Sequence, residues 1–134
     1  MRNMSVKLLA VLLVSLGMML APSPVFAHHS FAGSYFEDQN ARIEGKLVEF
    51  DYRSPHSFVI VDVADSKTGE AVRWAVEWRS GARLGREGVT RETLKPGDRV
   101  IVIGHPGRNP GEHRLHMWGI NRPSDGWKYG HATD

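Results

Sequence analysis

The sequence predicts an all-β fold, a small five-stranded barrel with a short helical insert between the third and fourth strands. Five segments of strand length are rich in β-branched and aromatic residues, and turns containing Gly or Pro separate them. One helix-compatible segment interrupts the series after the third strand. That order of elements is typical of the OB fold, a partly open Greek-key barrel. An SH3-like barrel is the nearest alternative, and the position of the insert favours the OB type.

The first predicted strand is residues 42–52. Its residues alternate, so that Val48, Phe50 and Tyr52 share one face and Leu47 lies on the opposite face. The strand ends where Pro55 follows, because proline fixes its own φ and restricts the residue before it.

The second and third predicted strands, residues 57–63 and 71–78, form a hairpin. The polar segment 65–70 between them contains a glycine near its end and has the composition of a turn. Alternation in the third strand places Glu77 on the face opposite a set of apolar side chains. These are Val72, Trp74, Val76 and Trp78.

Residues 80–94 contain helix-forming residues interrupted by glycines, which predicts one or two short helical turns, the second starting at Thr90. A Lys-Pro-Gly-Asp turn then precedes the fourth strand, residues 99–104. The fifth strand is predicted at residues 113–120. Residues 121–134 are polar and contain glycine, which predicts a flexible C-terminal tail.

The first 27 residues have the form of a secretory signal peptide. A charged start precedes an apolar run of 13 residues, and small residues occupy the −3 and −1 positions of a cleavage site after Ala27. The run is shorter than the roughly 20 residues that a membrane-spanning helix needs. We therefore expect a periplasmic protein whose mature chain begins at His28. The expected segments are the signal peptide 1–27, an N-terminal arm 28–41, the barrel 42–120 and the tail 121–134.

Composition excludes several classes of function. The mature chain would carry 15 basic and 15 acidic residues, without the clustered basic excess of a nucleic-acid-binding protein. We therefore expect no nucleic-acid partner and no membrane-embedded segment. Cysteine is absent, so disulfides and thiolate metal ligands are excluded.

Histidines provide the strongest candidate chemistry. A chain that begins at His28 offers a free amine and an imidazole on one residue, and His29 follows directly. His56, next to a proline at the start of the second strand, is the best internal partner. A nitrogen-rich site of His28 with His29 or His56 suits copper(II), with zinc as second choice. We expect copper affinity to fall as the pH drops through the histidine range near 6.5, because the ligands must be deprotonated.

The other histidine pair and the possible catalytic residues are weaker candidates for a functional site. His113 and His116 are three residues apart on a predicted strand and therefore point to opposite faces, so they cannot chelate one ion. Ser57 next to His56 makes no catalytic triad, since a triad requires groups that meet in space. Glu77 is a single carboxylate without an evident partner. The sequence thus predicts binding without enzymatic turnover.

An alternative function uses the aromatic side chains. Trp74, Trp78 and Trp118 can form a stacking platform for a small ligand or a protein partner, as OB barrels do for other ligands. Such a barrel could act in envelope stress without a metal. Packing in the core is the competing interpretation, because Trp74 and Trp78 share a face with valines.

Four short motifs together resemble a family of short exported bacterial proteins of unknown function. They are His28-His29-Ser30-Phe31, Ser54-Pro55-His56, Trp74-Ala75-Val76-Glu77 and Leu94-Lys95-Pro96-Gly97-Asp98. The resemblance covers nearly all of residues 28–120. It implies an OB-type barrel behind a signal peptide, with a mature His-His-Ser start and a later Asn-Pro-His motif, in which Ser54 replaces the usual Asn. It implies no activity.

Overall fold

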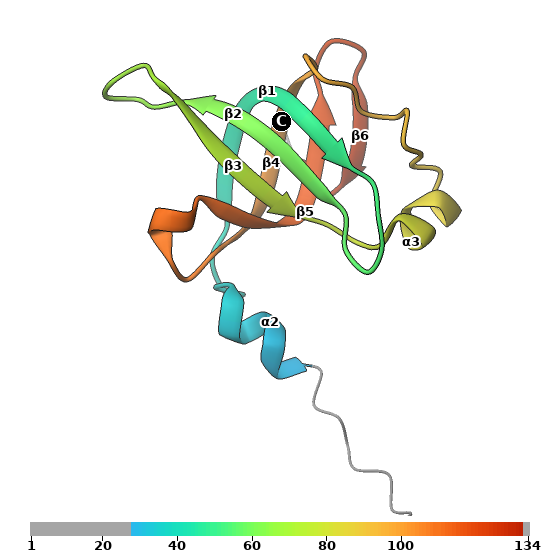
Figure 1. Cartoon of the computed structure of the whole chain (residues 1–134), viewed down its shortest axis with the longest axis horizontal. Helices are drawn as coiled ribbons and strands as arrows, with labels where there is room; N and C mark the ends of the chain where they lie inside the picture. The colour runs from blue at the N-terminus through green and yellow to red at the C-terminus, as the bar shows by residue number, and fades with distance from the viewer. Residues whose placement is uncertain (1–27, 133–134) are drawn as a thin grey trace, which may run out of the picture.

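The computed structural model describes residues 28–132, so the predicted signal peptide, residues 1–27, lies outside the described residues. The elements follow one another as a series of strands with short helical pieces between them (Figure 1). They are α2 (His28–Ser34), β1 (Ala41–Asp51), β2 (Phe58–Ala64), β3 (Ala71–Glu77), α3 (Gly81–Arg86), β4 (Arg99–Pro106), the 3₁₀ turn η1 (Pro110–Glu112), β5 (Arg114–Arg122) and β6 (Trp127–Gly130).

The strands form one closed barrel. Their order is β3-β2-β1-β4-β5-β6, and every neighbouring pair is antiparallel. A parallel pairing of β3 with β5 joins the two ends of the five-stranded part and closes it. This order, with α3 between the third and fourth strands, is that of an OB-type barrel. The predicted fold class is therefore confirmed.

The core contains inward-facing side chains from all five barrel strands and from the insert. Val59, Val76, Val100 and Leu115 are fully buried, and Leu84 of α3 covers one end of the barrel. Burial of this apolar surface is the main favourable contribution to folding. A chain without cysteine has no disulfide to add to it.

A β-bulge in β1 changes one sequence-based expectation. The pairing register with β2 shifts between Leu47 and Glu49, so one residue of β1 has no counterpart. Leu47 is consequently buried in the core, and Phe50 also packs against the core. The prediction that these two side chains lie on opposite faces was wrong, because strict alternation does not hold across a bulge.

The insert is shorter than predicted. Ser80 caps α3 by accepting a hydrogen bond from the Arg83 amide at 3.3 Å, and Tyr52 donates a hydrogen bond of 2.6 Å to the Gly81 carbonyl. Residues 90–94 form turns, so the second helical piece predicted at Thr90 is absent from this described segment. There the Thr90 amide donates to the Thr93 hydroxyl at 2.8 Å, a local bond that competes with a helical turn.

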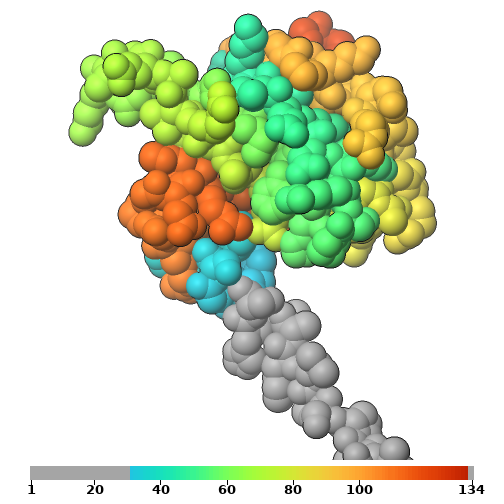
Figure 2. Space-filling view, viewed as in Figure 1, coloured from blue at the N-terminus to red at the C-terminus, as the bar shows by residue number. Residues whose placement is uncertain are grey.

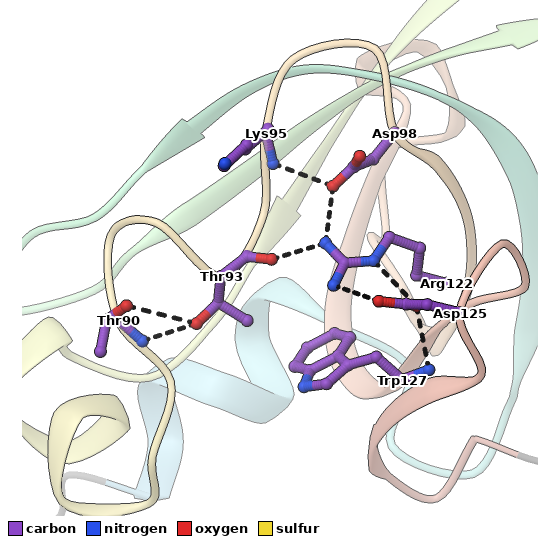
Figure 3. Close-up of polar contacts among 7 residues, drawn as sticks. All are labelled: Thr90, Thr93, Lys95, Asp98, Arg122, Asp125 and Trp127. Carbon is purple, nitrogen blue, oxygen red and sulfur yellow. Dashed lines mark hydrogen bonds and ion pairs between the residues drawn. The ribbon is translucent and has the colours of Figure 1, made fainter.

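The C-terminal segment is ordered as a strand, contrary to the predicted flexible tail. β5 continues to Arg122, and β6 pairs with it across a short turn. Arg122 fixes this turn by donating to the Thr93 carbonyl at 2.6 Å and pairing with both Asp98 and Asp125 (Figure 3). Because Thr93 and Asp98 are more than 20 residues from Arg122 in the sequence, the polar composition of the segment gave no sign of these contacts.

Among residues 28–132, no helix has the length and apolar character needed to cross a membrane.

Candidate functional site

The parallel seam between β3 and β5 brings together the main polar cluster of the outer barrel surface. Glu77 on β3 is paired with His116 on β5, and both side chains lie on the face away from the core. The N-terminal helix α2 packs over this face, and Figure 2 shows it lying against the β4–β5 connection. We call Tyr35, His56, Glu77, Arg114 and His116 the seam cluster.

Glu77 is the centre of the seam cluster. Its side chain is only 13% exposed, and three groups contact its carboxylate. The Tyr35 hydroxyl donates to Oε2 at 2.5 Å, His56 Nδ1 lies 2.5 Å from Oε1, and the Arg114 guanidinium donates to Oε2 at 3.3 Å. A carboxylate removed from water needs such partners, because burying an unpaired charge is costly. Burial, together with the neighbouring Glu77 carboxylate, raises the pKa of the Tyr35 hydroxyl well above its usual range.

His56 is held at the edge of the seam by a tight loop. Ser57 is fully buried, and its hydroxyl donates to the Arg53 carbonyl at 3.0 Å while accepting from the Arg53 amide. This closes the loop around Pro55, whose peptide bond with Ser54 is cis. Both of these hydrogen bonds of the Ser57 hydroxyl hold the loop together. The loop leaves the His56 side chain 57% exposed while its Nδ1 contacts Glu77.

That contact determines which ring nitrogen His56 offers to a ligand. A carboxylate at Nδ1 favours a proton on Nδ1, and a neutral ring in that tautomer presents the lone pair of Nε2. Histidines that bind metals very often have this arrangement, in which a carboxylate orients the ring through its other nitrogen.

His116 forms the buried wall of the seam cluster. Its ring packs edge-on against Phe31 of α2 with a centroid distance of 4.5 Å, and it also contacts Tyr35. Its Nδ1 is buried without a hydrogen-bond partner among the described residues. Burial lowers the pKa of His116, and the nearby Glu77 carboxylate opposes that shift.

Helix α2 is attached to the seam by several contacts. Phe31 stacks on Tyr35, Tyr35 pairs with Gly107 in an isolated bridge, and the Arg108 guanidinium donates to the Ala32 carbonyl at 2.6 Å. The predicted arm 28–41 is thus a helix followed by a short connection. His28, the first described residue of the helix, is one turn before Phe31.

The structure places the three predicted copper ligands as follows. His56 lies in the seam cluster, and the backbones of His28 and His29 start the helix that covers it. The side chains of His28 and His29 lie outside the described ones, so their part in a site stays a prediction. Among the described side chains, no three His, Asp or Glu groups are arranged to hold a metal ion.

The other histidines have separate surroundings. His113 packs against Trp74, and His116 packs against Phe31. His113 precedes β5 in a left-handed conformation, so it lies outside the strand that was predicted to include it. His105 and His131 both contact Trp118, and His131 is stacked on the indole at 4.3 Å.

The three tryptophans proposed as a platform occupy different environments. Trp78 is buried in the core against Phe50 and Tyr129. Trp118 is 43% exposed on the outer surface. Trp74 lies at the barrel edge and lines a cavity. Trp74 and Trp118 can each contact a ligand, but at separate positions on the barrel surface.

Sequence reasoning missed most of the seam cluster. Tyr35, Glu77 and His116 come from three elements that are far apart in the chain, and only the parallel β3–β5 pairing brings them together. The available signal was Glu77 itself, a carboxylate in a strand of apolar residues, which burial would require to have partners.

The comparisons with known proteins concern the family to which this chain belongs. No curated protein matches this sequence. A family model described as a family of unknown function, DUF6152, matches residues 16–116, which is more than half of the chain and includes the barrel up to His116 of the seam cluster. This chain therefore belongs to DUF6152, a family of unknown function.

Proposed function

We propose that this protein is exported to the periplasm and binds one copper(II) ion at the seam, through the amine and imidazole of an N-terminal His28 and through His56. The activity is binding or delivery of the ion without turnover. His29 is the alternative to His56 as the further ligand.

The observation that carries this proposal is the contact between His56 Nδ1 and the Glu77 carboxylate. It prepares the exposed His56 ring for a metal at Nε2 and leaves the carboxylate outside the ligand set. Tyr35 and Arg114 hold Glu77 in place, so the ring orientation does not depend on the metal.

The position of α2 supports the same site. Because α2 packs on His116 through Phe31, three residues after His28, processing before His28 would release a terminal amine one helical turn from that contact. An amine and two or three imidazole nitrogens form the tetragonal nitrogen set that copper(II) prefers. Since the described side chains alone do not make a metal site, the proposal requires the terminal residue.

The test uses the full-length chain, exported and purified from the periplasm. Intact-mass measurement should show a chain that starts at His28. Calorimetry and electron paramagnetic resonance should then show one copper(II) ion with nitrogen ligation and a Kd below about 10 μM, which corresponds to roughly 7 kcal/mol of binding free energy. Absence of binding in that range contradicts the proposal.

Variants separate the terminal residue from the seam. One additional glycine before His28 should weaken binding, and equal binding would remove the amine from the ligand set. Glu77→Gln should lower copper affinity about 10- to 100-fold, the usual effect of removing a group that orients a ligand. His113→Asn is the matched control, because His113 packs on Trp74 away from the seam cluster, and it should bind like the unmodified protein.

A further inference from the structure

A second site lies at the edge of the barrel and shares only Arg114 with the described residues of the seam cluster. A cavity of about 500 Å³ opens between β3, the start of the β4–β5 connection and the segment after α2. Its volume is in the range of pockets that bind small molecules. Six of its lining residues matter here: Phe36, Trp74, Pro106, Arg108, Pro110 and His113.

The walls of this cavity are suited to a flat apolar group. Trp74 provides an indole at the barrel edge, and Phe36, Pro106 and Pro110 provide further apolar surface. The His113 ring meets the indole edge-on at a centroid distance of 5.2 Å. His113 lines the cavity from the end of η1, with a left-handed backbone at φ of 47°, which is unusual for a residue other than glycine.

The charge of the cavity comes from Arg108. Its guanidinium lies over the Phe36 ring at 4.5 Å, and its Nε donates to the Ala32 carbonyl. Within residues 28–132, Arg108 makes no ion pair, whereas the neighbouring Arg114 is paired with both Glu77 and Glu112. The described lining residues include no carboxylate. A ligand with a negative charge would therefore supply the missing partner of Arg108.

We propose that this cavity binds a small aromatic carboxylate, with the ring between Trp74 and the proline-lined wall and the carboxylate on Arg108. Neither His56 nor Glu77 lines this cavity, and its test is done without copper. Failure of one proposal therefore leaves the other unaffected.

The probe is 2-naphthoate, and its neutral counterpart is 2-naphthamide. Protein obtained by export of the full chain is labelled with ¹⁵N, and the indole N–H signals of its four tryptophans are followed during titration. Trp74→Phe identifies the Trp74 signal. We expect a saturable shift of that signal with naphthoate, while the signal of the exposed Trp118 stays in place.

Charge is tested with two arginine variants. Arg108→Gln should weaken naphthoate binding about tenfold, to the level of naphthamide on the unmodified protein, because a charge-assisted hydrogen bond is lost. Arg86→Gln is the control, since Arg86 is exposed on α3 and makes no ion pair among the described residues. It should bind naphthoate normally. The overall NMR spectrum reports whether each variant is folded.

Three results would overturn the proposal. The first is no shift of the Trp74 signal at millimolar naphthoate. The second is equal affinity for naphthoate and naphthamide, because the cavity would then not select an anion. The third is a shift centred on Trp118, which would place binding on another surface.

Discussion

Replacing Tyr35 with phenylalanine tests the central contact of the seam cluster. Tyr35 is 2% exposed, and its hydroxyl donates to Glu77 at 2.5 Å while accepting from Arg114 at 3.1 Å. Phenylalanine keeps the ring and its stacking on Phe31, so the substitution removes little besides the hydroxyl.

The expected loss follows from what Glu77 retains. A hydrogen bond to a charged group contributes about 1.5–3 kcal/mol, and leaving a buried charge without partners costs more. Glu77 keeps its contacts with His56 and Arg114 in the variant, so the loss should lie in the lower part of that range. We expect Tyr35→Phe to lower the free energy of unfolding by about 1.5–2 kcal/mol and the Tm by roughly 6–10 °C.

The assay is equilibrium unfolding in urea at pH 7 without metal, followed by tryptophan fluorescence. A double-mutant cycle with Glu77→Gln isolates the contact, and the coupling free energy should be about 1 kcal/mol. Tyr129→Phe is the matched control, because the Tyr129 hydroxyl donates to Glu87, a carboxylate at the surface. Its effect should be clearly smaller.

A coupling free energy below about 0.3 kcal/mol would refute this reasoning, because such a value is within the error of additivity. The Tyr35 hydroxyl and Glu77 would then act independently, and Glu77 could not be regarded as held in place by Tyr35. An equal effect of the Tyr129→Phe control would lead to the same conclusion.

Three further predictions concern the barrel and its covering helix. Leu115→Ala, at a fully buried position, should lower the free energy of unfolding by about 3 kcal/mol in urea titrations, and a loss under 1 kcal/mol would mean the core is looser than described. Gly33→Ala should be neutral or stabilising by up to about 1 kcal/mol, because nothing lies within 4 Å of the added carbon. Gly119→Ala should lower the Tm, because its added carbon would lie 2.4 Å from the His131 backbone. A lower Tm for Gly33→Ala than for Gly119→Ala in thermal melts would contradict the packing. His116 has a lowered pKa in the folded state, so its contribution to stability is complete above about pH 6.5 and is lost as the pH falls toward that lowered value. His116→Asn should therefore make the urea midpoint less dependent on pH between 7.5 and 5, and an unchanged slope would show that another group controls it.

The sequence was sufficient to predict the barrel and most of its strands. Period-two alternation is a local property, and Val76 and Trp78 of the predicted third strand are buried as their spacing predicts. The same geometry predicted opposite orientations for His113 and His116, but His113 precedes β5 in a left-handed conformation, so strand alternation does not apply to it. The position of the helical insert was sufficient to select the OB order.

Sequence patterns within one segment did not predict the structural features that depend on pairing between distant segments. The bulge near Leu47 depends on how β1 meets β2, and the strand that contains Tyr129 exists because β5 offers it a free edge. A polar, glycine-containing segment looks the same in a flexible tail as in a short edge strand held by Arg122.

In the seam cluster too, the sequence indicated some residues and only the tertiary structure revealed the others. The sequence identified His56 through its neighbouring proline, and it marked Glu77 as a carboxylate among apolar residues. Only the tertiary structure placed them in contact and added Tyr35, because the parallel β3–β5 seam and the overlying α2 join residues that are 42 positions apart. Spacing along the chain determines which face a side chain occupies, whereas the closure of the barrel determines what lies opposite it.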